Sequence, residues 1–348
     1  MEVLSVVMPT YNAEKWAVAT IDNLAAQTYP NVELIVIDDG SQDGTVATVR
    51  GKLSANFRHP WRIIELGANS GPSAARNIGL RAAAGSWVQF LDSDDFMAPV
   101  KFERQMQHCL NAPSNLSAVY SAWQRCYYDD GDIVLEGDLA MPPDPAREPV
   151  MCFVGIDRPL LGSGIARRSV LEQIGGFDES LRFWECEDLF ARLAQAGGLE
   201  VVASSEPFYL WRMHRDKIYI GDETARYHST PVAVGWMELV LKQSLGRLAS
   251  EMRLMDAERS KLLDDCAVWA RILYSRDRPA FRQFVAMAQR LDPKIAPRQP
   301  RLARWLSPLI GYEAAEGVAR AGRIPGALKN KALNRLNLGG KRSAFDWK

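Results

Sequence analysis

The stretch Trp87-Val-Gln-Phe-Leu91-Asp92-Ser-Asp-Asp95 decides the fold of this chain. It begins with a short apolar, strand-forming run that stops abruptly after Leu91, and such a run predicts a buried strand. Three carboxylates follow within four residues, at Asp92, Asp94 and Asp95. Because open α/β sheets bind their ligands at the carboxyl ends of the strands, we expect these acids to face a cleft.

Two interpretations of this acidic segment are open at this point. Carboxylates with no basic residue between them repel one another unless a cation joins them. Mg²⁺ and Mn²⁺ prefer such oxygen ligands, together with substrate phosphates. The alternative is a turn, or a cap for the helix that Pro99 begins. The rest of the chain decides between them.

Strand and helix patterns alternate along the N-terminal part of the chain. The apolar spacing predicts strands over 3–8, 32–37, 61–66 and 87–91, and helices over 13–27 and 72–84. This alternation indicates right-handed crossovers and a mostly parallel sheet. The expected fold class is therefore α/β, with a mixed, Rossmann-like sheet flanked by helices. The G-x-G-x-x-G of a dinucleotide site is missing from this region.

The pattern changes after Asp95. The apolar spacing now predicts helices over 99–110, 168–174 and 187–196, and strands over 118–128, 162–166, 199–203 and 208–212. From about residue 230 to residue 291 the period is helical, with few Gly or Pro residues. We expect a domain boundary near residues 220–230 and a helical appendage beyond it.

Composition indicates an ordinary globular chain, since 47% of its 348 residues are hydrophobic and 24% are charged. The five cysteines have no metal-binding spacing, which is typical of reduced thiols in the cytosol. The first residues enter a strand pattern without the layout of a signal peptide. No run reaches the ~18 apolar residues of a membrane span. We expect a cytoplasmic protein.

The last part of the chain is basic. Residues 291–348 carry twelve Lys or Arg and four Asp or Glu, a net charge of +8, although the whole chain is neutral. An apolar stripe at helical spacing includes Trp305 and Leu309, and Ser307-Pro308 divides it into two short helices. A basic amphipathic tail can lie on an anionic membrane surface, which would make the protein peripheral on its inner face. The alternative is that these faces pack on the rest of the protein.

Six short motifs occur in a fixed order between Val3 and His214. They are Val6-Val-Met-Pro-Thr-Tyr-Asn12, Ile37-Asp-Asp-Gly-Ser-Gln-Asp-Gly-Thr45, Asn69-Ser-Gly-Pro-Ser-Ala-Ala-Arg-Asn-Ile-Gly79, Phe90-Leu-Asp-Ser-Asp-Asp95, Gly175-Gly-Phe-Asp-Glu179 and Glu187-Asp188. The ordered set resembles the family-2 inverting glycosyltransferases, which have the GT-A fold and use nucleotide-sugar donors. The resemblance does not cover the helical remainder.

The resemblance implies a division of the chain into domains. We expect a GT-A catalytic domain over 1–222, with a nucleotide-binding half over 1–95 and an acceptor half over 96–222. A helical C-terminal region with the basic tail would follow over 223–348.

Five residues are expected to bind the nucleotide. Tyr11, beside Pro9 and Thr10, suits stacking on a pyrimidine base. Asp39 can accept the uracil N3–H, which is the role that the resemblance implies. Arg76 can reach the base or the diphosphate with its several donors, and the alternative for it is a surface arginine. Seen alone, the segment that holds Asp39 also fits a turn followed by a helix cap.

A divalent cation, Mn²⁺ or Mg²⁺, is expected on the diphosphate. Asp94 would hold it, while Asp92 and Ser93 would contact the ribose or the donor sugar. His214 follows the last strand in an Arg-x-His sequence that lies near the metal and diphosphate in the similar family. It is expected as a metal ligand or phosphate contact, with a structural histidine as the alternative.

Inversion at the sugar carbon needs a base on the face opposite the leaving group. The resemblance assigns this role to Asp188, and Glu187 is the reserve. Both acids also fit the first turn of a helix, where they would favour its dipole. Trp184, Glu185 and Arg212 are expected near the acceptor, although Trp184 suits the core equally well.

The sequence thus predicts an inverting glycosyltransferase that moves a sugar from a nucleotide-sugar donor, most simply a UDP-sugar, to a saccharide hydroxyl. A lipid-linked glycan is the expected acceptor, and no nucleic acid is expected as a partner. A nucleotidyltransferase of related fold would need a glycine-rich loop where this chain has Pro9-Thr-Tyr-Asn12. A non-catalytic module that binds nucleotide sugars is the other alternative.

Overall fold

The computed structural model describes residues 2–129, 131–142, 159–181, 185–214, 237, 266–267, 270–271, 273–274, 277–291 and 312–315. The chain divides into two compact units, Met1–Thr224 and Ala225–Lys348. The expected residues Trp184, Trp305 and Leu309 lie outside the described part of the chain.

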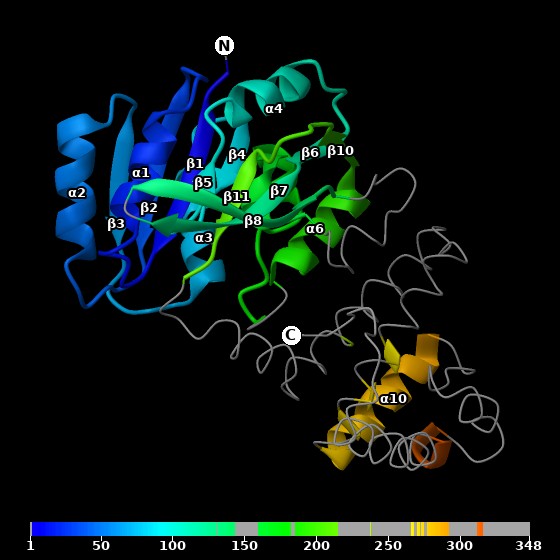
Figure 1. Cartoon of the computed structure of the whole chain (residues 1–348). Helices are drawn as coiled ribbons and strands as arrows, with labels where there is room; N and C mark the ends of the chain where they lie inside the picture. Colours follow the sequence, from blue (N-terminus) through cyan, green and yellow to red (C-terminus); the bar gives the residue numbers. More distant parts are fainter. Residues whose placement is uncertain are drawn as a thin grey trace, which may run out of the picture. The chain divides into compact units, whose positions relative to one another are not determined.

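Within the described part of the first unit, a seven-stranded sheet forms the centre (Figure 1). Its strands, in spatial order, are β10 (Gly198–Val202), β6 (Leu116–Ser121), β9 (Gly164–Arg167), β4 (Trp87–Phe90), β1 (Leu4–Thr10), β2 (Val32–Asp38) and β3 (Trp61–Glu65). Strand β9 is antiparallel to both of its neighbours, and the other pairs are parallel. The expected mixed, mostly parallel α/β sheet is confirmed.

The central strands are buried on both faces. Every residue of β2 and β4 is buried, which explains why their sequences read as continuous apolar runs instead of alternating ones. Helix α3 (Pro72–Ala82) packs on β1 and β2. It can come this close because Gly79 faces the sheet, where an added Cβ would lie 2.2 Å from Val7 Cγ1.

The other helices of the first unit cover this sheet and its edges (Figure 1). They are α1 (Ala17–Ala25), α2 (Thr45–Asn56), α4 (Lys101–Leu110), α5 (Arg168–Gln173) and α6 (Glu185–Ala196). Helix α2 has little separation of apolar and polar faces, and so its sequence gives no clear periodicity. Helix α6 begins two residues earlier than predicted, which brings Glu185 into its first turn.

A second, four-stranded sheet has the order β5 (Phe96–Met97), β11 (Tyr209–Arg212), β7 (Trp123–Asp129) and β8 (Asp132–Ala140). The single strand expected over 118–128 is wrong, because the chain leaves the large sheet at Ala122 and enters the small one. Strand β8 is mostly exposed, so no buried apolar pattern marks it in the sequence.

The described part of the second unit is helical, as its sequence period predicts. Helix α10 (Arg278–Leu291) buries Phe281, whose ring packs against Tyr274 and Tyr312. Glu313 accepts hydrogen bonds from Arg282 on the outside of this helix. None of the helices in the described part of the chain combines the length and hydropathy that crossing a bilayer requires.

Candidate active site

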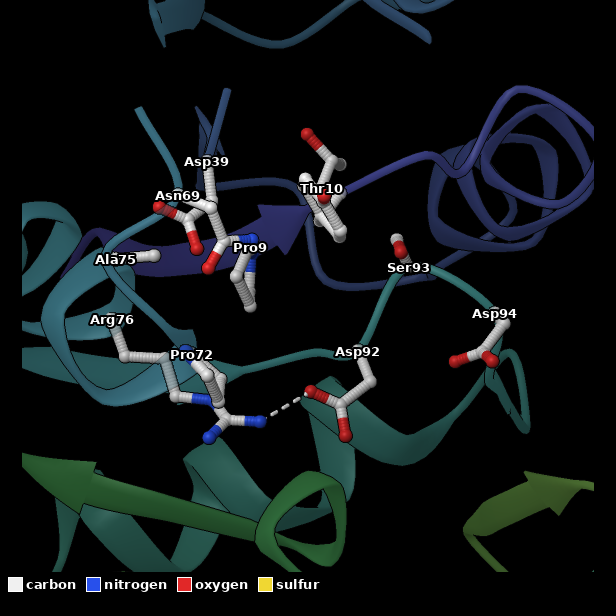
Figure 2. A pocket seen from close by; sticks show the side chains of 11 residues that line it. Pro9, Thr10, Asp39, Asn69, Pro72, Ala75, Arg76, Asp92, Ser93 and Asp94 are labelled. Atoms are coloured by element: carbon white, nitrogen blue, oxygen red, sulfur yellow. Dashed lines mark hydrogen bonds and ion pairs between the residues drawn. The ribbon is translucent and has the colours of Figure 1, made fainter. Parts of the chain in front are cut away.

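A pocket of about 240 Å³ opens where β1, β2 and β4 end and α3 begins (Figure 2). Its lining residues are Pro9, Thr10, Tyr11, Asp39, Asn69, Pro72, Ala75, Arg76, Asp92, Ser93 and Asp94. The structure therefore brings together all seven residues expected to bind the nucleotide sugar, along with one expected metal ligand. Sequence reasoning missed Asn69, Pro72 and Ala75, which lie in a quoted motif but carry no distinctive chemistry.

Asp39 shapes one wall of the pocket. Its two carboxylate oxygens accept the backbone N–H groups of Ser70 at 2.7 Å and Gly71 at 2.9 Å. These bonds hold the loop that leads into α3, where Gly71 adopts a positive φ of 91° and Pro72 starts the helix. Each carboxylate oxygen keeps a further lone pair, so Asp39 can still accept a hydrogen bond from a ligand.

The neighbouring Asp38 stabilises a turn and does not line the pocket. Its carboxylate accepts hydrogen bonds from Ser41, from the backbone N–H at 2.9 Å and from the hydroxyl at 2.5 Å. Asp43 in turn accepts the backbone N–H of Thr45 at 3.0 Å, where α2 begins. The turn considered for this segment is present, but the N-cap residue of α2 is Gly44, which has no side chain to cap the helix. Asp39 alone of these acids lines the pocket.

Arg76 is buried, so the alternative of a surface arginine is wrong. Its Nη2 donates to Asp92 Oδ1 at 2.8 Å, and Figure 2 shows these side chains pointing toward each other. Its Nη1 lies 3.6 Å from Glu185 Oε1. Burial would lower the pKa of Arg76, but the carboxylates of Asp92 and Glu185 raise it, so the guanidinium stays charged. Its buried Nε and Nη1 have no hydrogen-bond partner among the described residues.

Asp94 and His214 lie together, as a shared metal site would require. The Nε2 of His214 is 2.8 Å from Asp94 Oδ2, and the imidazole packs on Trp16 with ring centroids 4.3 Å apart. No group of three His, Cys, Asp or Glu side chains within the described residues is arranged to hold an ion. A carboxylate and an imidazole nevertheless fit a cation whose remaining ligands are waters and substrate phosphates.

Asp95 is not among the residues that line the pocket, and it is hydrogen-bonded to β11. It accepts the backbone N–H of Arg212 at 2.8 Å and the hydroxyl of Tyr209. Burial, together with the nearby carboxylates of Asp94 and Asp92, raises the pKa of Asp95 well above its usual range. These bonds fasten β11 to the end of β4.

Arg212, expected near the acceptor, lies among aromatic rings. Its guanidinium carbon is 5.0 Å from the ring centroid of Trp16, 5.3 Å from that of Phe96 and 4.7 Å from that of Tyr128. Burial lowers the pKa of Arg212, and Asp94 opposes that effect. The side chain is not among those that line the pocket.

The acids of α6 divide into buried and accessible ones. Asp188 is fully buried, and its Oδ2 accepts from Arg192 Nε at 2.7 Å. Glu187 is 8% exposed. Glu185 is the acid beside Arg76, and 20% of its side chain is exposed. The carboxylate of Asp188, which is expected to be the base, is therefore enclosed and paired with Arg192.

Comparison with known proteins defines the class of this site. Residues 5–144 match the family model described as glycosyl transferase family 2. The match confirms the resemblance drawn from the ordered motifs over this part of the chain. Residues 5–144 are thus similar to the family-2 glycosyltransferases.

Two curated relatives illustrate the similarity. An uncharacterized glycosyltransferase of Haemophilus influenzae is 42% identical over 110 residues, which cover 32% of this chain and 43% of that protein. The Escherichia coli UDP-Glc:alpha-D-GlcNAc-diphosphoundecaprenol beta-1,3-glucosyltransferase WfaP is 32% identical over 146 residues, 41% of this chain and 53% of that protein. The chain therefore spans about half the length of these relatives.

Solved structures confirm the GT-A type of fold. S. aureus TarS 1–349 in complex with UDP-GlcNAc has a TM-score of 0.57 and 19% identity, and the match covers 92% of each chain. The mannosyltransferase PcManGT from Pyrobaculum calidifontis, in complex with GDP-Man and Mn²⁺, has a TM-score of 0.50 and 17% identity. That match covers 92% of this chain and 86% of the mannosyltransferase. At these identities the likeness concerns the fold alone.

Proposed function

We propose that this chain is an inverting glycosyltransferase that transfers a sugar from a UDP-sugar to the hydroxyl of a saccharide acceptor. The observation that carries the proposal is the pocket itself. It gathers an exposed aromatic ring at Tyr11, a buried acid at Asp39 and a charged Arg76 at one edge of the sheet. A stacking surface, a base-edge acceptor and an anion-binding cation are the groups that a nucleoside diphosphate needs.

The donor assignment is supported from two sides. Asp39 suits the N3–H of uracil, and the neighbouring TarS structure contains UDP-GlcNAc. The relative WfaP is named as a transferase of glucose from UDP-Glc. A non-catalytic module would need none of the acids of α6, whereas this chain keeps Glu185 next to the pocket.

A divalent cation, Mn²⁺ or Mg²⁺, would be held by Asp94 and His214. When bound, it would neutralise the charge that develops on the leaving nucleoside diphosphate. Arg76 would add its charge to the same leaving group, since it lines the pocket and stays charged. Asp92, which Arg76 holds in place, would contact the ribose or the donor sugar.

The proposed acceptor is a lipid-linked saccharide. WfaP is named for such an acceptor, a GlcNAc-diphosphoundecaprenol. An enzyme with this acceptor would act in the cytoplasm at the inner face of the membrane, where the net charge of +8 on residues 291–348 would attract anionic lipids.

The test is a panel of UDP-Glc, UDP-GlcNAc, GDP-Man and dTDP-Glc, each with Mn²⁺, with Mg²⁺ and with EDTA. We expect UDP-sugars to raise the melting temperature only when a cation is present, because ligands that bind the folded state stabilise it. We also expect release of UDP when GlcNAc-diphosphoundecaprenol is added. If GDP-Man or dTDP-Glc stabilised the protein and the UDP-sugars did not, the UDP assignment would be contradicted. Binding of a UDP-sugar without transfer would favour the non-catalytic module.

A further inference from the structure

We infer that Glu185, and not Asp188, is the general base of the transfer, an inference that rests on the proposed function. The sequence points to Asp188 as the base because it belongs to the Glu187-Asp188 pair. The contacts of helix α6 argue for a different residue.

Asp188 is built into the fold as an ion pair. Its side chain has no exposed surface, and Arg192 contacts it with Nε at 2.7 Å and with Nη2 at 2.5 Å. The same arginine donates to the carbonyl oxygens of Ile174 at 2.9 Å and Gly176 at 2.6 Å. The pair thus joins α6 to the loop before it. A carboxylate that is enclosed and paired with an arginine in this way is not placed to meet an acceptor hydroxyl.

Glu187 is also poorly placed. Two residues along an α-helix correspond to a rotation of about 200°, so Glu187 lies on the side of α6 opposite Glu185. It is 8% exposed and has partners of its own.

Glu185 lies beside the donor pocket. The guanidinium of Arg76 contacts it at 3.6 Å through Nη1 and contacts Asp92 at 2.8 Å through Nη2. One buried arginine therefore holds two carboxylates, of which Asp92 lines the pocket and Glu185 lies beside it. The side chain of Glu185 is 20% exposed, so it can exchange a proton with a bound hydroxyl and then with water.

The surroundings of Glu185 also make it a better proton acceptor. Burial raises the pKa of Glu185, Arg76 on α3 opposes this, and Glu187 and Asp92 add to it. Cys186, the next residue on α6, is half-buried, and its desolvation raises the pKa of its thiol well above the usual range, which keeps it neutral. A carboxylate with a raised pKa accepts a proton more readily near neutral pH.

The step can be written in full. A carboxylate oxygen of Glu185 takes the proton of the acceptor hydroxyl while the hydroxyl oxygen bonds to the anomeric carbon. The bond between the anomeric carbon and the diphosphate oxygen breaks at the same time, and its electron pair leaves with UDP. The proton on Glu185 then passes to solvent, which restores the carboxylate.

The first experiment compares E185Q with E172Q, a matched change on α5 whose exposed side chain pairs with Arg168. The probes are UDP-Glc and UDP-GlcNAc, with GlcNAc-diphosphoundecaprenol as acceptor. We expect E185Q to lower kcat by about 10²–10⁴-fold, the usual contribution of a general base, and to leave donor affinity by calorimetry unchanged. E172Q should behave as wild type. A wild type without transfer would overturn the proposed function, whereas an active E185Q would overturn only the base assignment.

A second readout separates a base from a positioning residue. Azide attacks the anomeric carbon without needing a base, so it should restore UDP release in E185A and yield a glycosyl azide, detected by mass spectrometry. E185D should keep part of the activity and shift the acidic limb of the pH profile. If azide does not stimulate E185A, or if folded D188N loses transfer while E185Q keeps it, Glu185 is not the base. The E185Q result decides this even if D188N does not fold.

Discussion

Each of the three carboxylates after β4 contacts a different partner, and this partner determines what the carboxylate does in the structure. Asp92 is held by Arg76, Asp94 lies against His214, and Asp95 accepts hydrogen bonds from β11. The sequence shows only that three acids follow a strand. The structure adds that two of them line the pocket while Asp95 fastens two sheets together.

At the scale of single residues, we expect D94A to weaken UDP binding only in the presence of a cation. Asp94 is the expected metal ligand, and loss of a metal ligand should cost at least about tenfold in affinity. Titration calorimetry of UDP with Mn²⁺ and with EDTA measures the difference. Wild type and D94A should be alike in EDTA, and identical titrations in Mn²⁺ would remove Asp94 from the metal site.

At the scale of elements, α4 contributes a buried amine to the core. Lys101 is fully buried and donates to Gln89 of β4. Burial lowers the pKa of Lys101 well below its usual value of 10.5. The unfolded chain therefore binds a proton that the folded chain does not, over the interval between the lowered pKa and 10.5. The free energy of unfolding therefore rises with pH across that interval, and the stability gained in this way is lost as the pH falls.

We therefore expect K101M to reduce the dependence of the free energy of unfolding on pH. A difference of one bound proton corresponds to a slope of the free energy of unfolding against pH of up to about 1.4 kcal/mol per pH unit. The effects of the other titrating groups cancel when the slopes of K101M and wild type are compared. Urea unfolding at several pH values between neutrality and pH ~10 measures the two slopes. Parallel curves would mean that Lys101 is charged in the folded protein.

Hydrogen bonds also join helix α3 to the loop that precedes α6. Asn77 of α3 exchanges hydrogen bonds with the backbone of Phe177, accepting at 2.8 Å and donating at 2.9 Å. The ring of Phe177 lies 5.4 Å from the guanidinium carbon of Arg76. The loop before α6 is thereby fixed to α3, which brings Glu185 to Arg76. No local sequence signal announces this contact, because the partners are about a hundred residues apart.

At the scale of the whole molecule, we expect the basic tail to attract anionic membranes. Removing residues 321–348 deletes seven basic and one acidic side chain but retains 312–315, where Tyr312 packs on Phe281 of α10. Flotation with vesicles rich in phosphatidylglycerol should recover less of the shortened protein, since each basic residue near the surface contributes about 1 kcal/mol. Added salt should weaken recovery of the full chain. Equal recovery of both proteins would exclude the tail as a membrane anchor.

The sequence by itself determined the α/β class and most of the donor pocket. Parallel strands end at one edge of the sheet, so Thr10, Asp39 and Asp92 had to meet once their strands were recognised. It did not determine the small sheet, because β8 is exposed and carries no buried pattern. Only the tertiary structure decided which acid of α6 lies against Arg76 beside the pocket. Asp188 pairs with Arg192 one turn further along the same helix, which is a local pattern, whereas Glu185 meets Arg76 of α3 only because the two helices pack together.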